Sequence, residues 1–150
     1  MKIAYLSSEY VSHAKAAQGN RAALARLGVR FVDDPEQADV VVLHDEPPTY
    51  PDYMKAHPVL RQRHVVAYAV WETTQLPPSY VNSLDGIDEI WTASSFTEAL
   101  FSGVHPRVFR VPHLVREPTP DAEALERMRK RIDWQEDVFY FFTIADAANP

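Results

Sequence analysis

The sequence predicts an α/β fold, a Rossmann-like three-layer domain with a mainly parallel sheet. Short apolar runs alternate with helix-like segments along the chain, which is the pattern of a parallel sheet covered by helices. The run over residues 39–43 has a Val-Val-Val centre that is too continuously apolar for a strand with one solvated face. Polar residues follow several of these runs directly, where open α/β sheets present ligands.

Six apolar runs are expected to form the strands of this sheet, because each is short and bounded by turn or loop residues. These runs cover residues 3–6, 29–32, 39–43, 64–71, 90–92 and 108–111.

The segments between these runs carry helix signals of unequal strength. Residues 7–19 are expected to be a loop, and the Ala-rich residues 21–27 a helix that stops at Gly28. Three prolines force a loop after the third run, and a poor helix or an irregular segment is expected over residues 53–63. These prolines are Pro47, Pro48 and Pro51.

Two further helices are predicted in the second half of the domain. Pro78 fits the first turn of a short helix that ends near residues 85–86. This helix is expected to bury Tyr80, Val81 and Leu84. Ser95 and Glu98 have the Ser-x-x-Glu spacing of a capping box, which predicts a helix from residue 95 to about residue 103.

The character of the chain changes after residue 118. Residues 121–133 form a charged helical pattern with Thr119 as the expected cap and Leu125, Met128 and Ile132 on one apolar face. A nearly all-apolar strand is expected over residues 138–144. We therefore predict a domain over residues 1–118 and a connecting helix over residues 119–136. Residues 137–150 are either the start of a truncated second domain or the last strand of the same sheet.

Composition excludes some classes of function. The 150 residues are 46% hydrophobic and carry a formal net charge of −6, which argues against binding nucleic acid phosphates or an anionic membrane by charge alone. The chain has no cysteine, so disulfides and thiolate-bound metals are excluded. The sequence shows neither a signal peptide nor a run long enough to span a bilayer, and we expect a soluble cytoplasmic protein.

Three motifs follow one another at consistent spacing. The first is Trp71-Glu72-Thr73 with Leu76-Pro77-Pro78, the second covers residues 88–96 as DEIWTASSF, and the third is VFRVPH over residues 108–113. Together they resemble the N-terminal domain of GT-B fold glycosyltransferases of the glycosyltransferase group 1, or family 4, type. The resemblance covers most of residues 67–150 and is weak before them.

The resemblance implies an activity for a longer protein. A sugar would move from a nucleoside diphosphate sugar to a hydroxyl of an acceptor sugar or glycoconjugate, as in polysaccharide biosynthesis, and no metal or other cofactor is expected. The donor would bind mainly through a second domain, so this fragment would be inactive alone.

Glu72 is the candidate catalytic residue, because a carboxylate after an apolar strand can accept a proton or bind a sugar hydroxyl. Alternatively, Glu72 could be the N-cap of the following helix or form a salt bridge with it. Thr73 and Thr74 are candidate substrate-binding residues in the same loop. This loop departs from the resembling family, many members of which place a histidine there, so the acid–base assignment stays open.

Six other residues are candidates for substrate binding. His44, Asp45 and Glu46 end the third run, and consecutive residues diverge too much to make a good metal site, so acceptor contact or a solvated loop is expected. Ser94 and Ser95 could bind substrate through hydroxyls or helix-start amides, or serve only as caps. His113 could face a cleft or make a structural hydrogen bond.

Two other classes of function remain open from the sequence. A stand-alone nucleoside-processing enzyme would use Glu72 with His44, Asp45 and Glu46. A non-catalytic interaction module would self-associate or dock through residues 138–144 and the charged helix.

Overall fold

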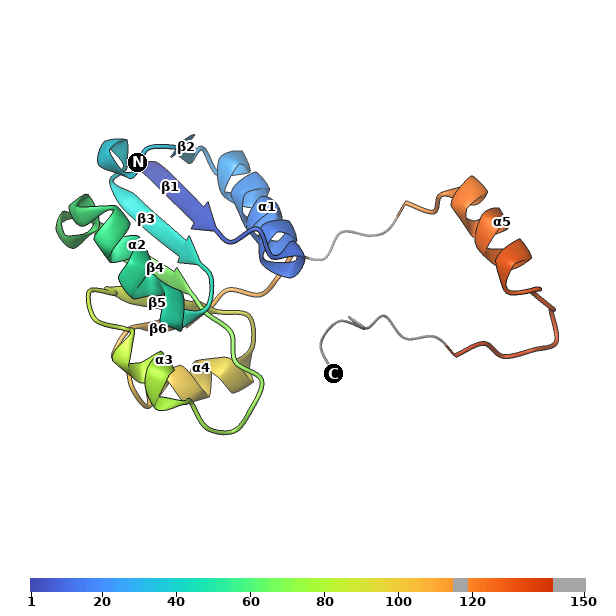
Figure 1. The fold of residues 1–150 in the computed structure, drawn as a ribbon. Coiled ribbons are helices and arrows are strands. Elements are labelled where there is room, and N and C mark those ends of the chain that lie inside the picture. The colour runs from blue at the N-terminus through green and yellow to red at the C-terminus, as the bar shows by residue number, and fades with distance from the viewer. Residues whose placement is uncertain (115–118, 142–150) are drawn as a thin grey trace. The chain divides into compact units, whose positions relative to one another are not determined.

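The computed structural model describes residues 1–114 and 119–141. The chain divides into two units, Met1–Val115 and Arg116–Pro150, and the first holds the whole sheet. Figure 1 shows this sheet with its helices.

The sheet has six strands in the order β2-β1-β3-β4-β5-β6, and all five neighbouring pairs are parallel. This confirms the predicted α/β class with a parallel sheet. The strands are β1 (Lys2–Ser7), β2 (Arg30–Val32), β3 (Val40–His44), β4 (His64–Tyr68), β5 (Glu89–Thr92) and β6 (Val108–Arg110). The fourth strand ends three residues before the expected position, so Trp71 does not belong to it.

Helix α1 (Val11–Arg26) is much longer than predicted, and the expectation of a loop over residues 7–19 was wrong. Gly19 lies inside the helix, where a glycine costs about 1 kcal/mol relative to alanine. The tertiary packing of Ala17 and Asn20, both buried, outweighs this local cost. The helix ends as expected, because Gly28 follows it with a φ of +83°, a conformation that favours glycine.

The segment between β3 and β4 is more helical than predicted. It contains η2 (Pro47–Thr49), α2 (Tyr50–Ala56) and η3 (Pro58–Gln62), and η1 (Pro35–Gln37) precedes β3. Pro51 does not extend the loop, because it lies in the first turn of α2, where a missing N–H costs no helical hydrogen bond.

Helices α3 (Pro78–Asn82) and α4 (Ser95–Ser102) occupy their predicted places. Tyr80 and Leu84 are buried as expected, whereas Val81 is 37% exposed and its predicted burial was wrong. In so short a helix only one face packs on the sheet, and Val81 follows Tyr80 by about 100° around the axis.

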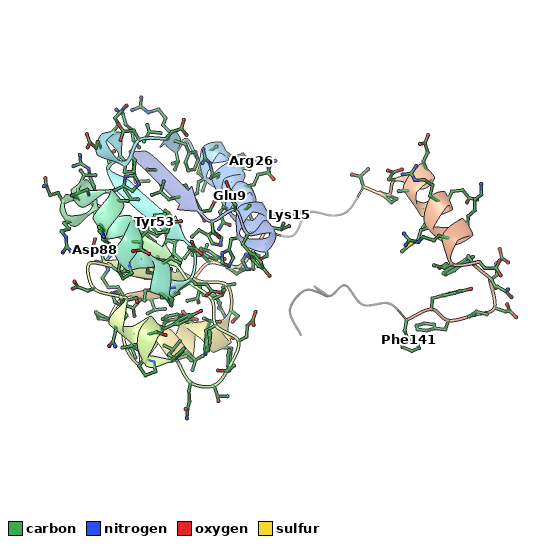
Figure 2. All side chains as sticks on the ribbon, viewed as in Figure 1. Glu9, Lys15, Arg26, Tyr53, Asp88 and Phe141 are labelled. Atoms are coloured by element: carbon green, nitrogen blue, oxygen red, sulfur yellow. The ribbon has the colours of Figure 1, made fainter. Side chains whose placement is uncertain are left out.

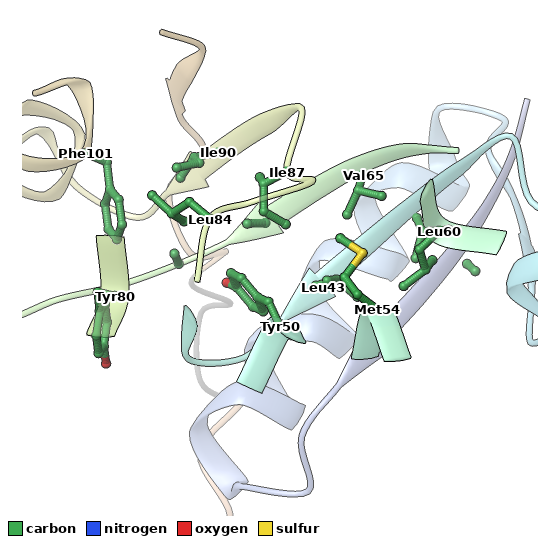
Figure 3. Close-up of a cluster of buried hydrophobic side chains, with 14 of the residues drawn as sticks. Leu43, Tyr50, Met54, Leu60, Val65, Tyr80, Leu84, Ile87, Ile90 and Phe101 are labelled. Carbon is green, nitrogen blue, oxygen red and sulfur yellow. The ribbon is translucent and has the colours of Figure 1, made fainter. Parts of the chain in front are cut away.

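Alternate strand residues pack on the two faces of the sheet. One cluster joins strand residues to Tyr50 and Met54 of α2, Tyr80 of α3 and Phe101 of α4, as Figure 3 shows. The second cluster places Ala17 of α1 against residues of β1, β3 and β4. Helices α2 to α4 therefore cover one face and α1 covers the other, which gives the three layers.

The second unit contains α5 (Ala122–Arg131). Its cap is Asp121, whose carboxylate accepts a hydrogen bond from the amide of Ala124 at 2.9 Å, so the expected cap at Thr119 was wrong. A carboxylate also interacts favourably with the helix N-terminus. Residues 138–141 form no strand, and residues 142–144 of that predicted strand lie outside the described residues.

Within the described residues, every helix is too short or too polar to cross a lipid bilayer.

Candidate functional site

The order of the strands places a topological switch point between β1 and β3. The chain leaves β1 toward β2 on one side and leaves β3 toward β4 on the other, so the two connections diverge at this point. Ligands of open α/β sheets bind at such a point, outside the carboxyl ends of the strands. Ser7 of β1 pairs in register with His44 of β3 at this edge.

Seven side chains gather at this edge, and we call them the histidine cluster. They are Tyr5, His13, Asn20, His44, Asp45, Tyr68 and His113.

The centre of the cluster is a buried hydrogen-bond chain. The Asn20 amide of α1 donates to the Tyr5 hydroxyl of β1 at 3.1 Å, and this hydroxyl lies 2.9 Å from Nδ1 of His44. Burial raises the pKa of Tyr5, so its hydroxyl keeps its proton. Burial, followed by repulsion from His13 and His113, lowers the pKa of His44 from 6.5 to about 4. The chain therefore consists of neutral groups at neutral pH.

His13 and Asp45 form the second part of the cluster. His13 lies in the first turn of α1, and its Nδ1 is 3.5 Å from Oδ1 of Asp45 and 2.9 Å from the Ser8 hydroxyl. The His13 and Asp45 side chains are only 14% and 12% exposed. They are therefore partly shielded from water, which strengthens their electrostatic interaction.

Several hydrogen bonds fix Asp45. Its Oδ1 accepts from the Glu46 amide at 2.8 Å, and its Oδ2 accepts from the Tyr53 hydroxyl at 3.2 Å. Its carbonyl accepts from the buried Tyr50 hydroxyl at 2.9 Å. Figure 2 labels Tyr53 on α2. Because these donors come from the segment that follows β3, the fold of that segment determines where the carboxylate points.

Tyr68 and His113 close the cluster on the β4 side. Tyr68 stacks on His44 with ring centroids 4.3 Å apart and an interplanar angle of 30°. Its hydroxyl donates to the Val111 carbonyl at 2.7 Å and lies 3.3 Å from Nδ1 of His113. His113 itself is exposed, and partial burial and repulsion from His13 lower its pKa. It forms the rim of the cluster.

The structure thus brings together three of the residues proposed from the sequence, His44, Asp45 and His113. Glu46 is exposed and precedes η2, where its carbonyl accepts from the Thr49 hydroxyl at 2.8 Å.

Glu72, Thr73 and Thr74 lie in an exposed loop after β4. The Gln75 carbonyl holds this loop by accepting from Nε1 of Trp71 at 2.7 Å and from the Thr73 hydroxyl at 3.3 Å. Trp71 packs on Tyr80 with centroids 4.6 Å apart. Burial first, and then the carboxylates of Glu46 and Glu72, raise the pKa of Tyr80 to about 12. The carboxylate of Asp45 makes the smallest contribution to this shift, so three carboxylates act on the same tyrosine.

Ser94 serves as the cap of α4. Its hydroxyl accepts from the Thr97 amide at 3.2 Å, whereas Ser95 is the first residue of the helix and is exposed. The predicted cap at Ser95 was therefore wrong by one residue.

Sequence reasoning missed Tyr5, His13, Asn20 and Tyr68. The two tyrosines lay inside apolar runs, and His13 lay in a segment that was interpreted as a loop. A polar ring inside a buried strand was the only available signal, because a buried tyrosine hydroxyl requires a hydrogen-bond partner.

Among residues 1–114 and 119–141, no group of three or more histidine, cysteine, aspartate or glutamate side chains is placed to hold a metal ion.

Neither family models nor curated proteins nor solved structures give a match to this chain.

Proposed function

We propose that this chain is the acceptor-side domain of a glycosyltransferase that moves a sugar from a nucleoside diphosphate sugar to an acceptor hydroxyl. The proposal combines the three sequence motifs with the parallel sheet. The observation that carries it is the meeting of His44, Asp45 and His113 at the carboxyl edge of the sheet. Hydrogen-bonding side chains at such an edge are suited to binding a polyhydroxylated ligand.

In this proposal the acceptor lies along the carboxyl edge of the sheet. Glu72 takes the proton of the reacting hydroxyl, and Thr73, Thr74 and Glu46 bind other hydroxyls. The acceptor oxygen bonds to the anomeric carbon while the bond from that carbon to the diphosphate breaks, and the diphosphate leaves with the electron pair. Positioning of the two substrates supplies much of the rate enhancement.

The donor nucleotide is assigned to a second domain. The first strand of this chain ends at Ser7 and is followed by Ser8 and Glu9, without a glycine-rich phosphate-binding pattern. The chain alone is therefore expected to be inactive in transfer. The absence of cysteine is consistent with the cytoplasm, which we propose as its location.

The test begins with the DNA downstream of the codon for Pro150. We expect a frame that continues through roughly 150 to 200 residues with an α/β pattern. The encoded protein should release nucleoside diphosphate in an acceptor-dependent manner from at least one member of a nucleoside diphosphate sugar panel. Glu72→Gln should lower this rate at least tenfold, or about 1.4 kcal/mol of barrier. A stop codon after Pro150, or no release from any donor, would contradict the proposal.

A stand-alone nucleoside-processing enzyme is the second candidate. One observation favours it, because the histidine cluster is built entirely from residues of the first unit. This candidate predicts that the 150-residue chain itself converts nucleosides or nucleotides, with loss of activity in His13→Gln. Incubation with a nucleoside panel and chromatographic analysis of the products distinguishes the two candidates.

A further inference from the structure

The hydrogen bonds of the histidine cluster assign the proton of the His44 ring. The Tyr5 hydroxyl accepts from Asn20, so its own single proton is directed to Nδ1 of His44. A neutral imidazole whose Nδ1 accepts a hydrogen bond carries its proton on Nε2. Within the described residues, Nε2 of His44 has no hydrogen-bond partner. This nitrogen is not completely buried. Nε2 of His44 is therefore a donor without a protein acceptor.

The neighbouring His13 ring has the opposite arrangement. The Asp45 carboxylate can only accept hydrogen bonds, and it lies 3.5 Å from Nδ1 of His13. A lone pair on Nδ1 would face this negative charge, so in the neutral form of the ring we place the proton on Nδ1, where it is donated to the Ser8 hydroxyl at 2.9 Å. Nε2 of His13 then carries a lone pair and is an acceptor.

The two rings are neighbours at the carboxyl edge of the sheet. Their centroids are 5.6 Å apart with an interplanar angle of 33°. A ligand oxygen that lies between neighbouring rings can make one hydrogen bond of about 2.8 Å to a ring nitrogen of each. A hydroxyl group both donates and accepts, which neither a carboxylate nor an ammonium group does.

We propose that His44 and His13 together bind one hydroxyl group of a sugar, with His44 donating to its oxygen and His13 accepting its proton in a hydrogen bond. This inference deepens the proposed function, on which its choice of a sugar rests, by placing one acceptor hydroxyl at the switch point between β1 and β3. It assigns a binding role to His13 and makes Asp45 and Tyr5 positioning residues.

An exposed aromatic ring beside the pair supports a sugar as the ligand. Tyr10 is 61% exposed, and its ring lies 5.5 Å from that of His13 at 70°. An aromatic ring offers an apolar surface to the C–H face of a sugar while the histidines bond its hydroxyls. This combination suits a polyol ring better than a phosphate, which has no apolar face.

Nitrogen-15 NMR of the 150-residue chain tests the assignment directly. In the chain with labelled histidine at neutral pH, we expect His44 to carry its proton on Nε2 and His13 on Nδ1. Tyr5→Phe should reduce the preference of His44 only, and Asp45→Asn that of His13 only. Tyr10→Phe, which keeps the ring, should change neither. The same tautomer in both rings, or a change in the wrong ring, would overturn the inference.

Titration with methyl α-glucoside and methyl α-mannoside tests the ligand class. The inference expects the Nε2 signals of His13 and His44 to shift together, while the signal of His64, at the opposite edge, stays in place. It is overturned if neither ring responds to either sugar, or if all six histidines respond equally. The transfer assay of the longer protein is a separate readout. Sugar-induced shifts without transfer would support the hydroxyl-binding site and would contradict only the proposed glycosyltransferase activity.

Discussion

The histidine cluster and the loop over residues 71–75 both follow strands of one sheet, yet they are constructed differently. In the cluster, His44 is 2% exposed and a chain of side chains from α1, β1 and β3 holds it. In the loop, Glu72 is exposed, and hydrogen bonds join its neighbours Trp71 and Thr73 to a single backbone carbonyl, that of Gln75. The cluster is therefore preorganised by the fold, whereas a catalytic role for Glu72 requires a substrate or a second domain to fix its position.

The largest expected contrast is in stability. His44→Ala removes the stacking on Tyr68 and leaves the Tyr5 hydroxyl without its acceptor, so we expect a loss of about 2–4 kcal/mol in the free energy of unfolding. Glu72→Ala should stay within about 0.5 kcal/mol, because its side chain is exposed. Urea denaturation of both variants measures the contrast. Equal losses would mean that the two regions are equally constrained.

Tyr5→Phe isolates the buried hydrogen-bond chain. It retains the ring but leaves the Asn20 amide and Nδ1 of His44 without partners, which should cost about 1–3 kcal/mol. Tyr10→Phe is the matched control, because Tyr10 is exposed and its variant should be neutral within about 0.5 kcal/mol. A neutral Tyr5→Phe would show that the chain contributes nothing to stability.

The pH dependence of stability reports the neutral state of His44. Its pKa is about 4 in the folded protein against 6.5 as its ordinary value, so the unfolded chain binds more protons between these values. The contribution of the neutral His44 ring to the free energy of unfolding should therefore be fully present above pH 6.5 and should decrease as the pH is lowered toward 4. The slope from this group should not exceed about 1.4 kcal/mol per pH unit.

Two other groups with shifted pKa values bear on the same measurement. The lowered pKa of His113 gives a contribution of the same sign, whereas Glu89, whose pKa is also lowered, loses its stabilising effect only below its ordinary value of 4.5. Denaturation series between pH 7.5 and 4.5 therefore isolate the histidines. His44→Phe should have a shallower slope than the wild type, and an unchanged slope would contradict the burial of a neutral ring.

The smallest contrast separates the two candidate serines. Ser94→Ala removes the cap of α4 and should cost about 1 kcal/mol. Ser95→Ala, at an exposed first helical position, should cost a few tenths. Thermal unfolding of the two variants measures the difference. A larger loss of stability in Ser95→Ala would indicate that Ser95 is the cap.

The sequence predicted the sheet well because its strands are continuous apolar runs, which only a sheet buried on both faces accommodates. It failed at α1, where residues 11–19 have no clear apolar periodicity and Gly19 interrupts the pattern. Tertiary packing of Ala17 and Asn20, which no local signal reveals, decides that helix.

The candidate site was predicted in part for a related reason. His44 and Asp45 stand directly after an apolar run, so their place at a strand end could be read locally. Their partners His13 and Tyr5 could not, because the contact depends on β1 lying next to β3, and strand order is a property of the whole fold.

The central claim is that the preorganised cluster at the switch point between β1 and β3 serves function, and not only the stability of the fold. The most direct measurement is kcat/KM for sugar transfer by the longer protein carrying Asp45→Asn, with Gln18→Ala on the exposed face of α1 as the control. We predict at least a tenfold loss, about 1.4 kcal/mol, for Asp45→Asn and no change for Gln18→Ala. Transfer within threefold of the wild type, by a folded Asp45→Asn protein, would contradict the account.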